Sequence, residues 1–278
     1  MAAGDILHVV GSLTPSRHAL KFIATADEAF CIDATAVARE AAADTEGTFT
    51  AWVNIPDITG DYGIISLGDT AAIEFITMRI IAGKLSGECN AATAIQWEYD
   101  STNVVITPHK WHHIAMVQDT STHPPRFYVD GVEVAMTMAD ETNNASWIAA
   151  CGNIDDGSIG AAEEAGAAGQ IRECKGGISD VKIWNKALTA EQVEKDYRGQ
   201  APASITGTTA DLTDWWKMKD LVNEISAARN GVKGASIQYC TGYSEFTSMM
   251  AFLGQLVADD MSISVNEKEG HIVITKAA

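Results

Sequence analysis

The sequence predicts an all-β fold: an antiparallel β-sandwich, with a short helix near residues 189–198 and a small C-terminal α-β-β appendage. The chain of 278 residues is 46% hydrophobic and has only 6 Pro, so it can bury a core. Short runs rich in β-branched and aromatic residues recur at roughly ten-residue spacing, with turn residues between them. The pair Asp130-Gly131 between two such runs indicates a two-residue hairpin turn.

The predicted strands begin at Gly47–Ile55, where Phe49, Ala51, Val53 and Ile55 alternate along one face. Because this face is apolar, we expect it to point into the sandwich. Further strands are predicted at Tyr62–Asp69, Ala71–Gly83, Thr93–Asp100, Val104–Thr107, Trp111–Asp119 and Arg126–Met138.

The second half of the sandwich begins with the small, acidic, glycine-rich run Asn153–Gly169, which indicates a long surface loop. Gln170–Leu188 returns to strand. The run Leu188–Gly199 predicts a short helix, because Thr189 and Gln192 can form a capping box at its start. Further strands are predicted at Asp211–Asp220 and Gly234–Tyr239.

The end of the chain has a different pattern. Apolar residues at helical spacing predict a helix, and MSISV and HIVIT around NEKEG predict a β-hairpin. We therefore divide the chain into an N-terminal arm (1–18), the sandwich (19–240) and the appendage (241–278). The apolar helix residues are either packed on their own sandwich or used in docking or homo-oligomerisation; the assembly candidates are Phe246, Met249, Met250, Leu253 and Val257.

Charge and cysteine content exclude several classes of function. The formal net charge of −18 disfavours binding to nucleic acid. The N-terminus has no pattern of a signal peptide, and no run of 18 apolar residues predicts a membrane span. The five cysteines are far apart without a CxxC, so most are expected to be reduced core residues; Cys151 with Cys174 is the one pair considered for a disulfide.

The histidine-rich run HKWHHIAMVQD suggests a metal site at first. On a strand, however, His112 and His113 point to opposite faces and cannot both bind one metal. The run is therefore better explained as an ordinary strand.

Four stretches resemble motifs of laminin-G-like (concanavalin A-like) jelly-roll domains, in the order of that family between residues 19 and 200. GTFTAWVNI is similar to its T-x-x-A-W-V strand, KWHHIAMVQD to W-x-H-V-A, RFYVDGVEV to the Y-V-D-G hairpin, and GGISDVKIWNKALTAEQV to the closing signature. DLTDWWKMKD also resembles a strand that accompanies this family in bacteriophage and marine viral structural proteins. The resemblance implies the fold and a structural role for His113, but not a function, because this architecture hosts lectins, adhesion modules and virion proteins.

An enzyme is not expected. A glycosidase of this shape needs two carboxylates facing one cleft, whereas Glu74 and Glu98 each stand alone on their predicted strands. No cofactor is expected either. Calcium, which many domains of the resembled family bind, has only weak ligand candidates here: Asp69, Asp155 and Asp156, with Asp130 and Asn153 beside them.

Two functions remain as hypotheses. The main one is a non-enzymatic virion structural protein, a capsid decoration (cement) or surface protein, assembled in the host cytoplasm with partners such as the major capsid protein. The alternative is a glycan-binding, lectin-like adhesion module or tail-fibre component that grips host surface glycans. Most tryptophans are expected in the core; Trp147 and one of Trp215 and Trp216 are the candidates for exposure. The predicted ligand residues are Trp147, Asn153, Asp155 and Asp156.

Overall fold

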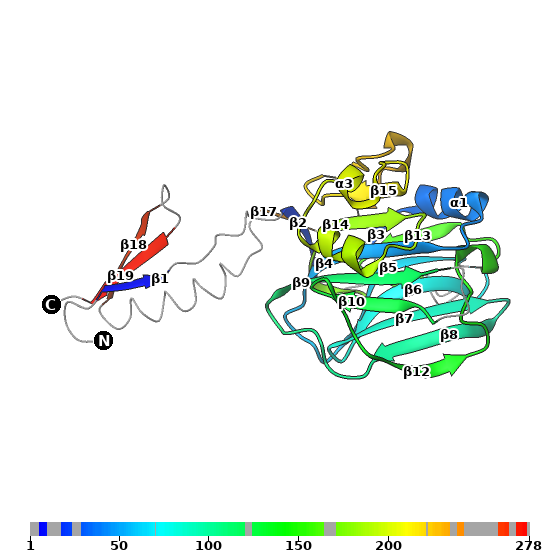
Figure 1. Ribbon diagram of the computed structural model, residues 1–278, viewed down its shortest axis with the longest axis horizontal. Helices are drawn as coiled ribbons and strands as arrows, with labels where there is room; N and C mark the ends of the chain where they lie inside the picture. Colours follow the sequence, from blue (N-terminus) through cyan, green and yellow to red (C-terminus); the bar gives the residue numbers. More distant parts are fainter. Residues whose placement is uncertain are drawn as a thin grey trace. The chain divides into compact units, whose positions relative to one another are not determined.

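Two antiparallel β-sheets form a sandwich in the computed structural model, which confirms the predicted all-β jelly-roll class (Figure 1). Compact units are formed by Ala19–Cys240 and, separately, by Met1–His18 together with Thr241–Ala278. The structure describes residues 6–9, 18–23, 29–69, 71–119, 124–163, 171–220, 222–233, 238–241, 261–266 and 271–276.

The first sheet has the strand order β11-β10-β9-β4-β14-β2-β17, and β15 also pairs with β14. Its strands are β2 (His18–Ile23), β4 (Gly47–Asn54), β9 (Trp111–Gln118), β10 (Arg126–Val129), β11 (Val132–Glu133), β14 (Lys175–Trp184), β15 (Leu212–Trp216) and β17 (Gln238–Thr241). Asp130 and Gly131 join β10 to β11 with φ values of 52° and 79°, so the predicted hairpin turn is confirmed.

The second sheet has the order β12-β8-β7-β6-β5-β13-β3-β16. Its strands are β3 (Phe30–Cys31), β5 (Asp61–Asp69), β6 (Glu74–Ile81), β7 (Lys84–Ala91), β8 (Ala94–Ser101), β12 (Met136–Glu141), β13 (Asp156–Ile159) and β16 (Val232–Lys233). In Figure 1, β8 and β12 lie at the lower edge of the sandwich, away from α1 (Asp33–Ala42) and α3 (Pro202–Thr206).

The predicted strand pattern is incomplete, because β2, β3 and β16 were not predicted, and it differs from the structure in three further places. Strand β7 was not predicted, because its sequence KLSGECNA is poor in β-branched residues. The run Val104–Thr107 is not a strand, although its apolar Ile106 is buried and the Val105 and Ile106 amides donate to the Gly83 carbonyl. The expected acidic surface loop contains β13, whose Gly157–Ile159 segment is buried between β5 and β3.

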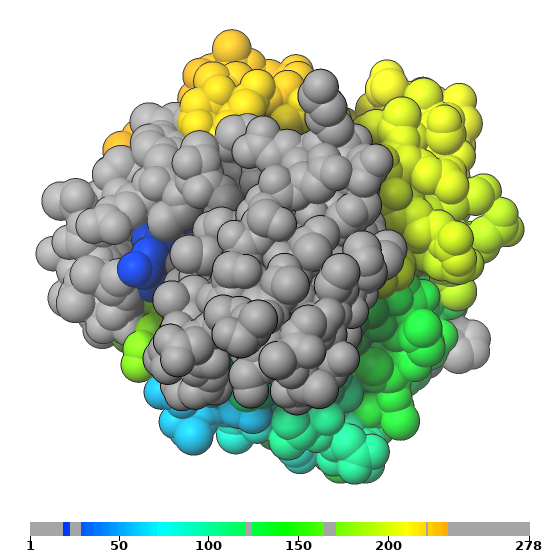
Figure 2. All heavy atoms as spheres, turned by 90° about the vertical axis from the view of Figure 1, so that its left-hand side faces the viewer, coloured from blue at the N-terminus to red at the C-terminus, as the bar shows by residue number. Residues whose placement is uncertain are grey.

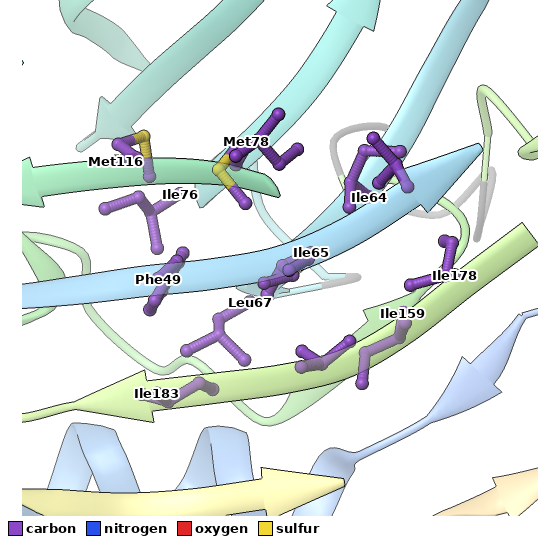
Figure 3. Packing of buried hydrophobic residues seen from close by; sticks show 14 of the residues in the cluster. Phe49, Ile64, Ile65, Leu67, Ile76, Met78, Met116, Ile159, Ile178 and Ile183 are labelled. Carbon is purple, nitrogen blue, oxygen red and sulfur yellow. The ribbon is translucent and has the colours of Figure 1, made fainter. Parts of the chain in front are cut away.

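The core lies between the two sheets. Phe49, Ala51, Val53 and Ile55 belong to it, which confirms the predicted alternation in β4. Figure 3 shows side chains of both sheets interleaved here, with Phe49, Met116, Ile178 and Ile183 from the first sheet and Ile65, Leu67, Ile76 and Met78 from the second. Each such buried side chain contributes roughly 1.5–3 kcal/mol to folding before entropy is subtracted.

The helices are short and lie outside the sheets. Helix α2 (Ala190–Tyr197) begins with the predicted capping box: the Gln192 amide donates to Thr189 Oγ1 (3.3 Å) and the Thr189 amide to Gln192 Oε1 (2.9 Å). Helices α1 and α3 were not predicted, nor were the 3₁₀ turns η1 (Ile148–Ala150) and η3 (Ala227–Arg229). Among the described residues, the helices are all too short or too polar to cross a membrane.

The second unit contains a three-stranded sheet of order β1-β19-β18, made of β1 (Ile6–Val9), β18 (Met261–Asn266) and β19 (His271–Lys276). The predicted C-terminal hairpin is confirmed, with Ile263 opposite Ile274. Strand β1 from the predicted N-terminal arm pairs with β19. The helix expected at 246–257 lies outside the described residues, so the assembly role of Phe246, Met249, Met250, Leu253 and Val257 stays a prediction, as do the three domain limits.

Candidate functional site

The outer face of the first sheet is closed by α2. There Lys182 Nζ donates to Asp196 Oδ1 (2.9 Å) and Asp180 Oδ2 (2.8 Å), and His113 Nε2 lies 3.2 Å from Asp196 Oδ2. Lys182, Asp196 and His113 are at most 3% exposed. In Figure 2 the yellow-green surface of α2 adjoins the green surface around β10 and β11, where a Cβ on Gly131 would lie 3.1 Å from Tyr197. We call this the α2-covered face.

Burial alone would raise the pKa of Asp196, but Lys182 and His113 lower that pKa far below its usual value. The carboxylate of Asp196, a residue of α2, is therefore ionised and paired with Lys182 and His113 between the helix and the sheet. His113 has the structural position that the sequence resemblance implied, and the α2-covered face has no room for a ligand at this ion pair.

The outer face of the second sheet is polar. Its side chains come from β5, β6, β7 and β8, and the cross-strand register places Thr77 between Ser66 and Glu88, Arg79 beside Ser86, and Glu88 beside Glu98. We call this the Arg79 face; its members are Ser66, Thr77, Arg79, Ser86, Glu88, Glu98 and Asp100. The residues that alternate with them, such as Met78, Cys89 and Trp97, point into the core.

Arg79 is at the centre of this face and is 2% exposed. Its Nη1 lies 2.8 Å from Glu88 Oε2, its Nη2 lies 2.6 Å from Glu98 Oε1, and its Nε donates to Ser86 Oγ at 3.3 Å. Both guanidinium ends are thus engaged by carboxylates of neighbouring strands. This arrangement fixes the two glutamates in position.

Solvent exposure rises across the Arg79 face toward the sheet edge. Ser66 is fully buried, the Glu88 side chain is 10% exposed and that of Glu98 is 23% exposed. Asp100 is half-buried, and Asp140 on β12 is exposed. A ligand approaching this face therefore meets Glu98 and Asp100 first.

At β5, where the side chains of the Arg79 face are most buried, the face is bordered by the segment 160–163. The Glu163 amide donates to Ser66 Oγ (2.9 Å). Gly63 and Gly68 on β5 permit this close approach, because a Cβ at those positions would lie 2.3 Å from the Ala161 carbonyl carbon and 2.4 Å from the Glu163 carbonyl oxygen. The face is thus bounded at β5 and open toward β8 and β12.

The Arg79 face carries excess negative charge. Burial raises the pKa of Glu88, and neighbouring Glu98 and Asp100 raise it further against the opposing effect of Arg79. Hydrogen-bond acceptors are also left over: Asp100 Oδ1 is buried without a partner, and so is Oδ1 of Asn90, which lies two residues from Glu88 on the same face of β7 and is 6% exposed. The face offers acceptors to a ligand that donates.

A pocket of about 240 Å³ opens next to this edge, where β10 and β11 of the first sheet approach β8 and β12 of the second. Tyr99, Pro125, Phe127, Glu133 and Met136 are among its lining residues. The Tyr99 hydroxyl donates to Glu141, and burial together with Glu141 raises the pKa of Tyr99 well above its usual value. This phenol stays protonated at neutral pH.

The expected exposure of Trp147, on which its choice as a ligand residue depended, is wrong. Its side chain is 1% exposed and lies against Phe49 with ring centroids 5.0 Å apart, because the turn at η1 folds it into the core. Trp216 is also buried, whereas Trp215 is half-buried, as alternation along the strand predicts. Trp215 belongs to β15 of the first sheet, where its indole N–H donates to Asp180.

The other predicted ligand residues are not among the members of the Arg79 face. Asn153 and Asp155 are exposed, and Asp156 is half-buried at the start of β13. Burial, Asp156 and then Asp69 raise the pKa of Asp155, so the three calcium candidates do lie close together. In the described part of the chain, however, no group of three or more His, Cys, Asp or Glu side chains is arranged to hold a metal ion.

The disulfide considered between Cys151 and Cys174 is wrong. Both are free thiols, and Cys151 lies instead beside Cys89 with a sulfur–sulfur distance of 3.6 Å. Sequence spacing did not reveal this neighbour because β7 itself was not predicted.

The Arg79 face was also not predicted from the sequence. Its signal is the alternation of polar Thr77, Arg79, Ser86 and Glu88 with apolar residues on both sides of the Ala82-Gly83 turn. That turn has φ values of 48° and 75°, typical of a tight hairpin. A hairpin centred there places Arg79 opposite Ser86, and the separate pairing of β7 with β8 brings Glu98 beside Glu88.

Comparisons with known proteins agree with this architecture. The family described as the concanavalin A-like lectin/glucanases superfamily (Laminin_G_3) matches residues 32–194. The CBM40 of the Ruminococcus gnavus IT-sialidase, bound to α2,3-sialyllactose, is similar with a TM-score of 0.53 and 12% identity over 64% of this chain and 96% of that one. No match was found among curated proteins.

Two larger proteins are similar over part of their length. The leech intramolecular trans-sialidase has a TM-score of 0.51 and 16% identity over 66% of this chain, and the NanB sialidase of Streptococcus pneumoniae has 0.52 and 14% over 65%. In each, the match covers 28% of the larger chain. At these identities the likeness concerns the fold. The family model, in contrast, matches more than half of the sequence and therefore shows the family. The chain belongs to the concanavalin A-like lectin/glucanases superfamily.

Proposed function

We propose that this chain is a non-enzymatic glycan-binding module whose ligand contacts the Arg79 face at its open edge. The observation that carries the proposal is the row of fixed polar side chains that reaches solvent at Glu98 and Asp100. Polar groups held in place before binding recognise hydroxyl-rich ligands at low entropic cost. The bound sialyllactose in a solved structure of similar fold supports a glycan as ligand class.

The geometry of the two glutamates supports binding rather than hydrolysis. A glycosidase needs two carboxyl groups on either side of the scissile bond, one of them a proton donor. Here Glu88 and Glu98 are both bound to the guanidinium of Arg79, with contacts of 2.8 Å and 2.6 Å. The space between the carboxylates is therefore occupied by a side chain rather than open to a substrate.

The proposal is tested on a glycan array with the full chain and two matched variants. Glu98→Gln changes the open edge of the Arg79 face, and Glu191→Gln makes the same change on α2, where the side chain is 75% exposed. We expect array signals that Glu98→Gln alters and Glu191→Gln leaves unchanged. An array without signal, or signals equally altered by both variants, would contradict the proposal.

The capsid decoration role, the major capsid protein as partner and the location in a virion stay predictions from the sequence. A glycan-binding module is compatible with them, because a surface protein of a virion can also grip host glycans. Co-sedimentation of the native protein with particles would test these predictions separately.

A further inference from the structure

We infer that the Arg79 face selects its glycan by charge: it favours amino sugars with a protonated amine and disfavours sugars with a carboxylate. The inference deepens the proposed function and rests on it. It also sets this chain apart from the similar module that was solved with sialyllactose, an anionic glycan. Three features of the face support it.

The first feature is that Arg79 is already engaged. A ligand carboxylate on this face would bind most strongly to a guanidinium. Arg79 is 2% exposed and holds Glu88, Glu98 and Ser86. An anionic sugar would therefore have to displace a protein carboxylate that is fixed by its own strand.

The second feature is the charge balance. The outer-facing positions of β6, β7, β8 and β12 carry four carboxylates, Glu88, Glu98, Asp100 and Asp140, and two cations, Arg79 and Lys84. The excess is negative, and Glu98 and Asp100 add to the effect of burial in raising the pKa of Glu88, against the opposing effect of Arg79. A ligand cation relieves this repulsion, whereas a ligand anion adds to it.

The third feature is the set of hydrogen-bond acceptors without partners. Asn90 is 6% exposed and its Oδ1 has no hydrogen-bond partner, and the buried Oδ1 of Asp100 has none either. Unpaired buried acceptors are unfavourable, and a donor from a ligand removes the cost. An ammonium group has three N–H donors and no acceptor, so it complements a face whose spare groups accept.

Isothermal titration with matched ligands tests the inference. Chitotetraose and its fully deacetylated form share one backbone and differ in amine charge, and 3′-sialyllactose differs from lactose by an added sialic acid residue, which carries a carboxylate. At pH 6 and low salt, we expect the deacetylated tetramer to bind about tenfold more tightly than chitotetraose, and sialyllactose more weakly than lactose. The difference within each pair should shrink at 0.5 M salt, because exposed charges are then screened.

Matched variants distinguish an effect of the Arg79 face from an effect of the negative net charge of the protein. Glu98→Gln and Asp100→Asn should each reduce the preference for the deacetylated tetramer at least threefold. Glu191→Gln makes the same change in net charge on α2 and should leave the preference unchanged. Thermal melting of each variant would confirm that it is folded.

The outcomes distinguish the inference from the proposed function. Equal binding within each pair, or tighter binding of sialyllactose than of lactose, would overturn the charge selectivity while leaving a glycan-binding module. Equal effects of Glu98→Gln and Glu191→Gln on the preference would also overturn it. Binding of none of these ligands, with an empty glycan array, would overturn both.

Discussion

The outer faces of the two sheets each hold a buried cation between carboxylates, yet they have opposite surroundings. On the α2-covered face, Lys182 lies between Asp180 and Asp196 beneath a helix, and Asp196 is fully buried. On the Arg79 face, exposure rises to 23% at the Glu98 side chain. The comparison shows that similar ion pairs serve different purposes: one fastens a helix to the sandwich, and the other orients groups toward solvent.

The physical difference is solvation. Burial of a charge is unfavourable unless a partner compensates it completely, so the covered pair depends on every contact. Charges that water reaches interact more weakly and can exchange partners. The effects of substitutions on the free energy of unfolding should therefore differ in size between the two faces, and in one case in sign.

The largest expected effect is that of Asp196→Asn. It leaves Lys182 beneath α2 without its fully buried carboxylate partner, and we expect a loss of about 3–5 kcal/mol in the free energy of unfolding. Urea unfolding would measure it, with Glu191→Gln at the exposed surface of α2 as the control, for which a change below about 0.5 kcal/mol is expected. A loss below about 1 kcal/mol in Asp196→Asn would show that the covered ion pair does not hold the helix on the sheet.

Asp196 also sets the acid limit of the fold. Its pKa is lowered in the folded chain, so its contribution to stability is present above the usual pKa of 3.8 and is lost as the pH falls below that value. Urea unfolding of the wild type and Asp196→Asn at pH 5, 4 and 3 should show the stability difference between them shrinking with each step. A difference that stays constant over this range would contradict the assignment.

Arg79→Met should cost less, about 2 kcal/mol, although it also removes a cation from between two carboxylates. The cost is smaller because water reaches Glu98 and can solvate the charges that remain. In the same variant Arg79 no longer holds Glu98 in its orientation, so glycan binding on the array should weaken. A loss as large as that of Asp196→Asn would show that the Arg79 face is as closed as the other.

Thr189→Ala removes the capping box of α2 and should cost about 1 kcal/mol. Because α2 covers only the first sheet, glycan binding should not change. Thermal unfolding and the array would be measured together, and Thr206→Ala on α3 would serve as the control. Loss of binding in Thr189→Ala would indicate that the ligand contacts the α2-covered face.

The smallest effect is expected for Glu88→Gln, and its sign should depend on pH. The pKa of Glu88 is raised in the folded chain, so ionisation favours the unfolded chain and the wild type loses stability as the pH rises through the usual value of 4.5. Between pH 4 and pH 7, the free energy of unfolding of Glu88→Gln should therefore rise relative to that of the wild type. The change should be less than about 1 kcal/mol, because Arg79 retains its ion pair with Glu98. A stability difference that moves in the opposite direction would show that ionised Glu88 stabilises the fold.

Local patterns were enough to predict much of the sandwich. The alternation in β4, the Asp130-Gly131 turn and the Thr189–Gln192 capping box each depend on residues a few positions apart, and each is present in the structure. The confirmed elements are those in which local preference and burial agree. In β7 and β13 they disagree, because polar and glycine residues there occupy interior strands of a sheet.

The sequence by itself determined the fold class, the apolar side of its clearest strands and the helix that covers the first sheet. The tertiary structure alone decided that Trp147 is buried, that Cys151 lies beside Cys89, and that Arg79, Glu88 and Glu98 meet on three neighbouring strands. The reason is register: a shift of one residue in any of these strands would turn its polar side chains into the core. Hairpin turns and the packing of the two sheets fix that register, so the candidate site exists only once the strands are paired.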